Sequence, residues 1–303
     1  MLPRSINGPS LRARRERKKE CTAVGGDGQP TSMVLRRGCR IALTAVLFLM
    51  GTLIVPSTEL GAPTDDAAAA APKPLGLSGS WKLTFSDDFN GKSVNWKKWT
   101  DRSSSQSDNG HGNKKNQQLE WNRRSNCSVS KGVLTQTAKR QNVKSPSGVK
   151  YKWTSCLVTT TPSFAFQYGY IEIRSKLPSG KGFWPSFWTW QSPDNGVWTE
   201  TDVYEFFSDN PKALYVAQQS GRADGCTVKK HGFNPSKGFH VYGADITPTG
   251  TVFYIDGKRV CSTLSTSTGP TNIIISNFVY SKKPPSSKAK GKHQIDYVRA
   301  WKR

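Results

Sequence analysis

Trp198-Thr-Glu-Thr-Asp-Val-Tyr-Glu-Phe-Phe207 holds three acids within six residues, at Glu200, Asp202 and Glu205. Val, Tyr, Phe and Thr favour extended backbone, so the stretch predicts a β-strand rather than a helix. In a regular strand Glu200 and Asp202 point to one face and Glu205 points to the other. One extra residue between Asp202 and Glu205, a β-bulge, would bring all three carboxyls to one face, and bulges are common beside active sites.

The spacing of these acids fits two roles. Two carboxyls close together on one face are what hydrolysis of a glycosidic bond requires, one ionised as the nucleophile and one protonated as the acid. A solvated strand face without chemistry is the other role, and so short a motif does not exclude it. Features elsewhere in the chain are needed to decide between a catalytic role and a solvated strand face.

The N-terminal quarter has the composition of a targeting segment. Residues 1–32 are basic and lack apolar periodicity, so they predict a disordered leader, or no part of the translated protein if Met33 is the true start. Arginines then precede the apolar run Ile41–Val55, and an Ala-rich stretch follows it. This order is typical of a secretory signal peptide, which we expect over residues 33–66, with an Ala/Pro linker over 67–76.

The apolar run is shorter than the roughly 20 residues that a bilayer-spanning helix needs, so no stable membrane anchor is expected. The sequence therefore predicts a secreted, extracellular protein that is cleaved between Ala62 and Ala71. Residues 77–303 have a suitable length for one domain with a sizeable core, and we expect that domain to be a monomer.

The positive charge lies mainly in this domain. Residues 1–76 contain 11 of the 44 Lys and Arg and 6 of the 21 Asp and Glu, which leaves 33 basic against 15 acidic residues, a net charge of +18. Such a field attracts polyanions, and a sulfated or uronate polysaccharide or an anionic cell wall would suit an exported protein. Nucleic acid is not expected as a partner, because no nucleic-acid motif accompanies the charge. The alternative explanation for this positive charge is that it only keeps the protein soluble.

Four cysteines follow the leader, Cys127, Cys156, Cys226 and Cys261. An even number in an exported domain indicates two disulfides, for which three pairings are open. We favour Cys127–Cys156 and Cys226–Cys261, because each joins segments that are close in sequence. The chain has no C-x-x-C spacing that would indicate zinc.

Short alternating segments and turns predict an all-β fold. Ile171 and Ile173 share one face of the segment 169–177, and Arg174 lies on the other. Residues 251–262 predict a hairpin, because the Asp256-Gly257 pair suits a type I′ turn. Residues 271–280 and 295–301 predict further strands, and residues 103–116 and 281–292 predict loops. Many strands with such punctuation indicate a sandwich or a barrel.

Eight segments in order resemble glycoside hydrolase family 16, the retaining endo-β-glycanases that include laminarinases, lichenases, agarases and carrageenases. They are Phe85-Ser-Asp-Asp-Phe-Asn-Gly91, Asn116-Gln-Gln-Leu-Glu-Trp121, Gly132-Val-Leu-Thr-Gln-Thr-Ala-Lys139, Gly169-Tyr-Ile-Glu-Ile-Arg-Ser-Lys-Leu-Pro178, Gly182-Phe-Trp-Pro-Ser-Phe-Trp188, Phe239-His-Val-Tyr-Gly243, Phe253-Tyr-Ile-Asp-Gly257 and Asp296-Tyr-Val-Arg-Ala-Trp301. The resemblance implies a β-jelly-roll sandwich of two antiparallel sheets with a concave substrate groove, and it favours the catalytic role of the acids.

The resemblance also implies a role for each acid of the strand. Glu200 matches the family's nucleophile, Glu205 its acid/base, and Asp202 the carboxylate between them. With Glu200 ionised, a nearby carboxyl resists losing its proton, so Glu205 is expected to stay protonated until it donates to the leaving oxygen. We expect Asp202 to hydrogen-bond Glu200. No cofactor is required for this chemistry.

Four further residues match positions that line the family's groove, Trp184, Trp188, Arg174 and Asn116. For the tryptophans the alternative is a place in the core, and for Arg174 it is an ion pair with Glu172. Asp296 matches a carboxylate that in some members binds a structural calcium.

Some departures from the laminarinase pattern put β-1,3-glucan in doubt as the substrate. Gln218 and Gln219 lie where laminarinases usually carry a histidine, and Thr199 lies where they commonly have glycine. The sequence therefore predicts a secreted retaining endo-β-glycosidase acting on a β-glucan or on an anionic or galactose-based polymer. A non-catalytic carbohydrate-binding protein on the same fold and a cell-wall transglycosylase are the alternatives.

Overall fold

The structure is a computed structural model that describes residues 71–191 and 198–303. The described residues belong to one compact unit, Asp66–Arg303. The predicted leader, the signal peptide and residues 67–70 of the linker lie outside the described residues. In the described part of the chain, no helix is long and apolar enough to cross a membrane.

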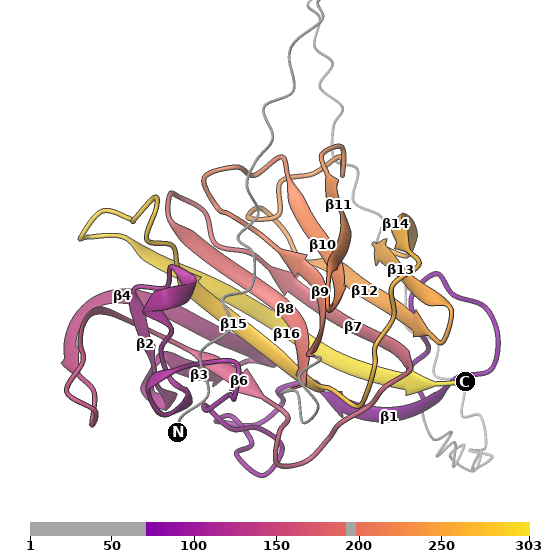
Figure 1. Cartoon of the computed structure of the whole chain (residues 1–303), viewed down its shortest axis with the longest axis horizontal. Helices are drawn as coiled ribbons and strands as arrows, with labels where there is room; N and C mark the ends of the chain where they lie inside the picture. Colours follow the sequence, from indigo (N-terminus) through magenta and orange to yellow (C-terminus); the bar gives the residue numbers. More distant parts are fainter. Residues whose placement is uncertain (1–70, 192–197) are drawn as a thin grey trace, which may run out of the picture. The chain divides into compact units, whose positions relative to one another are not determined.

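Two β-sheets make up the unit, and the larger one is called sheet A (Figure 1). The strands of sheet A follow the order β14-β13-β12-β7-β16-β4-β5-β2, with β1 beside β16 and β3 beside β4. They are β1 (Lys82–Asp87), β2 (Glu120–Asn122), β3 (Cys127–Ser130), β4 (Val133–Lys144), β5 (Lys150–Ser155), β7 (Gly169–Lys176), β12 (His240–Thr247), β13 (Gly250–Ile255), β14 (Lys258–Thr263) and β16 (Lys290–Lys302).

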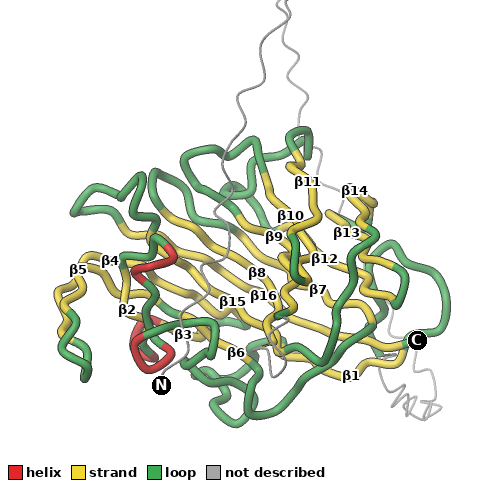
Figure 2. Tube along the Cα trace, in the orientation of Figure 1, coloured by secondary structure: helices red, strands yellow, loops and turns green. Residues whose placement is uncertain are grey.

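Sheet B has six strands in the order β11-β10-β9-β8-β15-β6. They are β6 (Leu157–Thr159), β8 (Phe183–Gln191), β9 (Thr199–Glu205), β10 (Leu214–Ser220), β11 (Ala223–Val228) and β15 (Asn272–Val279). Helical structure among the described residues is limited to the short 3₁₀ turns Asp108–Gly110, Lys114–Asn116 and Arg124–Asn126 (Figure 2). The all-β sandwich is therefore confirmed, although the short β2–β5 pair is parallel and not antiparallel.

The local predictions hold with one change. The hairpin is formed by β13 and β14, and Asp256 and Gly257 both have positive φ, at 47° and 74°, as a type I′ turn requires. The predicted loop over residues 281–292 is too long at its C-terminal end, because β16 already begins at Lys290. The lysines of that segment pair with β4, a partner that the local composition does not reveal.

The core lies between the two sheets. Sheet A contributes Ile171 and Ile173, and sheet B contributes Phe187 and Ile275, all with no exposed surface. A buried hydrogen bond crosses the core between Tyr204 of β9 and His293 of β16. The Tyr204 hydroxyl lies 2.8 Å from Nε2 of His293 on β16, and burial lowers the pKa of His293 to about 3, so the ring is neutral near pH 7. This contact ties β9 to sheet A.

Both favoured disulfides are confirmed, Cys127–Cys156 and Cys226–Cys261. The first joins β3 to the junction between β5 and β6, where the chain passes from sheet A to sheet B. The second joins β11 to β14, which are edge strands of the two sheets. One edge of the sandwich is thus closed covalently.

Replacing Cys226 and Cys261 together by serine should lower the free energy of unfolding by about 4 kcal/mol, because the bridge closes a segment with a sequence separation of 35 and so restricts the unfolded chain. Denaturant titration of the double variant and of the parent gives the difference. A matched double variant at Cys127 and Cys156 closes a similar separation of 29 and should lose a similar amount. A loss below about 1 kcal/mol in the first variant would contradict the expectation.

Candidate active site

Strand β9 carries a bulge between Asp202 and Glu205. Consecutive residues of β8 pair with Tyr204 and Asp202, which leaves Val203 as the extra residue. The pairing with β10 shifts in the same interval. Val203 and Tyr204 both join the core between the sheets, so the bulge restores the parity of the strand. The predicted bulge is confirmed, and Glu200, Asp202 and Glu205 share the face of sheet B that points away from sheet A.

Each acid on this face has a polar partner. The Trp184 indole donates from Nε1 to Oε1 of Glu205 at 3.0 Å. The Gln219 amide donates from Nε2 to Oδ2 of Asp202 at 2.6 Å. Glu200 and Asp202 are hydrogen-bonded to each other through their side chains, as expected from the sequence. Asp202 is buried, whereas the two glutamates are half-buried and so remain reachable from solvent.

The environment raises the pKa of all three acids. Burial is the largest cause in each case, and it raises the pKa of Glu205 to about 8 and that of Asp202 to about 6. The negative charge of Asp202 adds to the increase at Glu205, and the Trp184 hydrogen bond opposes it. Burial and the charges of Asp202 and Glu205 raise the pKa of Glu200 well above its ordinary range. Glu200 and Glu205 therefore hold protons near neutral pH, whereas Asp202 is largely ionised there.

The causes of the raised Glu205 pKa differ in one respect from the expectation. Glu200 was expected to be the charge that keeps Glu205 protonated, but burial and the charge of Asp202 raise the Glu205 pKa. The reason is that Glu200 shares its hydrogen bond with Asp202, which raises the Glu200 pKa and lowers that of Asp202.

Aromatic rings flank the acids along β8 and its neighbours. Trp184 stacks on Phe207, with ring centroids 5.2 Å apart and planes 24° apart, and its edge meets Tyr280 at 5.7 Å. Trp190 of β8 lies opposite Glu200 in the β8–β9 strand register. Its ring stacks on that of Trp198, with ring centroids 5.8 Å apart. Aromatic faces of this kind pack well on apolar surfaces such as the faces of sugar rings.

Trp188 lies between these two groups. It pairs with Asp202 in register, is 6% exposed, and donates from Nε1 to Oγ of Ser276 at 3.2 Å. Trp184 and Trp188 therefore lie on β8, the strand that pairs with β9 and its acids. Both are also largely buried in one apolar cluster, so the core role of the tryptophans and a place beside the acids are combined.

The other two residues with predicted groove positions are placed differently. Asn116 is exposed at the end of the 3₁₀ turn Lys114–Asn116, and its backbone N–H donates to Oδ1 of Asn113. Arg174 lies on β7, where Ile171 and Ile173 face the core, so its side chain points away from sheet B and its acids. The structure does not bring Arg174 to the acids.

The partner of Arg174 also differs from the ion pair expected with Glu172. Its guanidinium contacts Asp296, with Nη1 2.5 Å from Oδ2, and lies over the Phe239 ring at 5.0 Å. The sequence could not reveal this contact, because Arg174 and Asp296 belong to neighbouring strands separated by 122 positions.

The surroundings of Asp296 do not fit a structural calcium. A hard cation needs several oxygen ligands, whereas one carboxylate oxygen here is held by the Arg174 guanidinium. In residues 71–191 and 198–303, no three His, Cys, Asp or Glu side chains gather in a way that could hold a metal ion.

Sequence reasoning missed Gln219 as a site residue. It was singled out only as a departure from the laminarinase pattern, yet its amide holds Asp202 and its backbone pairs with Glu200. The register between β10 and β9 makes this contact, and a bulge shifts that register by one residue. Phe207 and Tyr280 were missed as partners of Trp184 because Tyr280 is brought there only by the β15–β8 pairing.

Comparison with known proteins agrees with this arrangement. The sequence model of Glycosyl hydrolases family 16 matches residues 105–299. Endo-1,3-1,4-beta-glycanase EglC of Rhizobium meliloti (strain 1021) is 32% identical over 184 residues, which cover 57% of this chain and 39% of that protein. The chain thus spans about two fifths of the length of this relative.

Solved structures show the same fold. The catalytic domain of an endo-1,3-beta-glucanase (laminarinase) from Thermotoga petrophila RKU-1 is matched with a TM-score of 0.66 at 23% identity, over 74% of this chain and 98% of that one. Endo-beta-1,3-glucanase from Pyrococcus furiosus is matched with a TM-score of 0.66 at 25% identity, over 73% and 94%. The family match covers well over half of the 303 residues and includes the three acids of β9. The chain belongs to glycosyl hydrolases family 16.

Proposed function

We propose that this protein is a secreted, retaining endo-β-glycosidase that cleaves a β-linked polysaccharide by double displacement. The observation that carries the proposal is the bulged strand β9, which presents Glu200, Asp202 and Glu205 on one face beside a row of aromatic rings. A strand that only bound sugar would not need three acids with raised pKa values, each of which costs stability to bury.

In the first step, a Glu200 carboxylate oxygen attacks the anomeric carbon. The bond from that carbon to the leaving sugar breaks, and the Glu205 proton goes to the leaving oxygen. The pKa of Glu205 near 8 keeps this proton available at neutral pH. Asp202 takes the proton that it shares with Glu200, and so leaves Glu200 ionised for the attack.

In the second step, water attacks the glycosyl–Glu200 ester. Glu205 is now a carboxylate and accepts the proton of the water, and Glu200 leaves as a carboxylate. The Gln219 amide stays on Asp202 throughout and fixes the carboxyl group that orients Glu200. Two inversions at one carbon give net retention of the anomeric configuration.

A β-glucan is the substrate class that we propose. The relatives carry names that specify endo-1,3-1,4-β-glycanase and endo-1,3-β-glucanase activities. Release of reducing ends from laminarin, lichenan, agarose, carrageenan, galactan and hyaluronan separates the substrates. The proposal expects release from lichenan or laminarin, with products that only shorten. Release from agarose or carrageenan alone would overturn the substrate class, and chains that lengthen would indicate a transglycosylase.

Replacing Trp184 with Phe tests the hydrogen bond to the acid/base. The indole N–H lowers the Glu205 pKa by stabilising its carboxylate, so its loss should raise that pKa above about 8. Glu205 must be protonated to donate, so the alkaline limb of kcat/KM against pH should move to higher pH, by up to about one unit.

Trp188→Phe is the matched control, because its indole donates to Ser276 and not to an acid. It should leave the alkaline limb in place, even if the loss of packing lowers kcat. If the alkaline limb stays in place in Trp184→Phe, or moves equally in both variants, then the limb does not arise from the titration of Glu205.

We also propose that the protein is exported by residues 33–66 and acts as a monomer outside the cell. The basic segment followed by a short apolar run supports export. N-terminal sequencing of the protein recovered from culture medium should begin between residues 62 and 71, and an intact N-terminus at Met33 on the recovered protein would oppose cleavage.

A further inference from the structure

Lysines are concentrated on the outer face of sheet A, where β16, β4 and β5 lie side by side. Trp153 and Tyr151 of β5 face the core, as do Ala138 of β4 and His293 of β16, so the residues between them face outward. We call these outward residues the lysine face: Lys139 and Lys144 of β4, Lys150 and Lys152 of β5, and Lys290 and Lys292 of β16. All are exposed except Lys139, which is half-buried.

Two pairs within the lysine face put like charges directly opposite each other. Lys139 pairs with Lys290 across β4 and β16, and Lys144 pairs with Lys150 across β4 and β5. Like charges opposite each other on one face of a sheet are destabilising. A bound polyanion would remove this repulsion.

The lysine face holds no acid that could neutralise it. Within the described part of the chain, none of its six lysines forms an ion pair. Three acids in this part of the molecule have other partners: Asp296 of β16 contacts Arg174, Asp88 contacts Arg299, and Asp108 accepts hydrogen bonds from Ser147 and Tyr151 of the β4–β5 hairpin. The basic excess of the domain is therefore directed, at least in part, onto one face.

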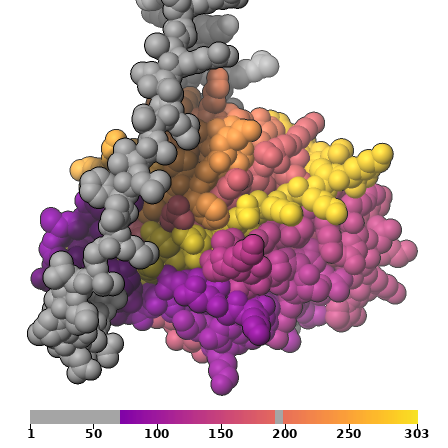
Figure 3. Space-filling model, turned by 180° about the vertical axis from the view of Figure 1, so that it is seen from behind, coloured from indigo at the N-terminus to yellow at the C-terminus, as the bar shows by residue number. Residues whose placement is uncertain are grey.

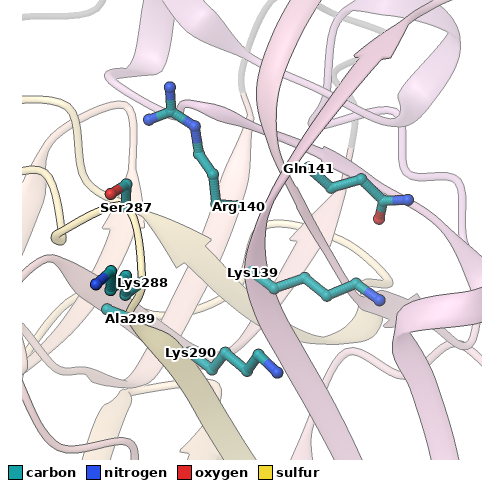
Figure 4. A pocket seen from close by; sticks show the side chains of 7 residues that line it. All are labelled: Lys139, Arg140, Gln141, Ser287, Lys288, Ala289 and Lys290. Carbon is teal, nitrogen blue, oxygen red and sulfur yellow. The ribbon is translucent and has the colours of Figure 1, made fainter.

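The surface here is hollowed as well as charged. A hollow of about 570 Å³ lies between β4 and the residues that lead into β16, and Lys139, Arg140, Lys288 and Lys290 are among its lining residues. Figure 4 shows Lys139 and Lys290 extending the same way from adjacent strands, with Arg140 on the other side of β4. A second hollow, of about 380 Å³, includes Lys144, Lys150 and Lys152.

We propose that the lysine face binds an anionic polysaccharide, one with carboxylates or sulfates along its chain, at a site separate from the acids of β9. The lysines form rows about 5 Å apart across the strands and about 7 Å apart along them, a spacing that a linear polymer with closely spaced charges can follow. Seen from behind, the yellow β16 runs beside the magenta residues of β4 and β5 (Figure 3).

Two other polyanions fit this surface less well. Single-stranded nucleic acid is bound by stacking bases on aromatic rings, and lipid surfaces are bound by inserting apolar side chains. The large hydrophobic side chains exposed in the described residues are Leu75, Tyr168 and Leu264, none of which lies in β16, β4 or β5. The lysine face therefore offers a partner positive charge without exposed aromatic or apolar side chains. Such a surface suits a sugar polymer whose rings carry the anionic groups.

The lysine face and the acids lie on opposite outer faces of the sandwich. The acids are on sheet B and face away from sheet A, and the lysines are on sheet A and face away from sheet B. A polymer on the lysine face therefore does not compete with a sugar chain at the acids. It would hold the enzyme in an anionic matrix while β9 acts on another chain.

Polygalacturonate binding to the full-length protein tests the site. A variant with Lys139, Lys144, Lys150 and Lys290 changed to Gln should bind about tenfold more weakly or worse at 0.1 M salt, and the affinity of the parent should fall steeply as salt rises. The matched control changes Lys92, Lys97, Lys229 and Lys258 to Gln, which are exposed lysines outside the three strands. It removes the same charge and should stay within about twofold of the parent.

If both variants bind polygalacturonate equally weakly, the net charge of the protein alone determines binding. That result would overturn the proposal that the lysine face is the binding site. Unchanged binding in the lysine-face variant would do the same. Tighter binding of a single-stranded oligonucleotide or of anionic phospholipid vesicles than of polygalacturonate, lost in the same variant, would overturn the class of partner. Thermal unfolding should show that the lysine-face variant is at least as stable as the parent, since the repulsive pairs are gone.

Discussion

The Glu200→Gln variant should lose catalysis by a factor on the order of 10⁴ or more while still binding the polysaccharide. The amide is the same size as the carboxylate and keeps a hydrogen bond to Asp202, but it cannot form the ester intermediate. The effect should therefore fall on kcat and leave the affinity for substrate nearly unchanged.

Turnover of lichenan and laminarin, measured beside binding of the same polymers by calorimetry, gives this split. Glu172→Gln is a suitable control, because Glu172 is a buried glutamate on β7 of sheet A, away from the acids. It should keep its activity, although it can lose stability. An activity of Glu200→Gln within about tenfold of the parent would remove Glu200 from the nucleophile's role.

The Glu205→Gln variant should have a kcat on polysaccharide that is lower by roughly 10²- to 10⁴-fold, the contribution of a general acid/base. The loss should depend on the leaving group. An aryl glycoside whose phenol leaves without a proton should form the glycosyl–enzyme nearly as fast as in the parent, so that the second step becomes limiting and the intermediate accumulates.

The pH dependence gives a second signature of Glu205. Burial and Asp202 raise its pKa to about 8, so the protonated form is lost, and activity with it, as the pH rises through about 8. This alkaline limb should disappear in Glu205→Gln. Equal losses on polysaccharide and on the activated aryl glycoside, with the limb retained, would place the acid elsewhere.

Local patterns predicted much of the fold and of the site. The bulge in β9 followed from parity alone, because Glu200, Asp202 and Glu205 can share a face only if one residue is inserted. The type I′ turn at Asp256-Gly257 followed from the residue types that tolerate positive φ. Such features depend on residues near one another in the chain.

The features that the sequence did not predict depend on register between distant strands. Gln219 reaches Asp202, and Arg174 reaches Asp296 and not Glu172, because of which strands pair and by how many residues. The Lys139–Lys290 pair likewise arises from the β4–β16 register. A shift of one residue would turn each of these side chains to the opposite face, and composition does not specify that shift.

The anomeric configuration of the first product tests the double displacement most directly. Proton NMR of lichenan or laminarin during the first minutes of hydrolysis, before mutarotation, resolves the new reducing end as α or β. Attack by Glu200 followed by attack of water predicts the β-anomer, the configuration of the bond that was cleaved. An initial α-anomer would mean that water attacks directly, and it would contradict the nucleophilic role of Glu200.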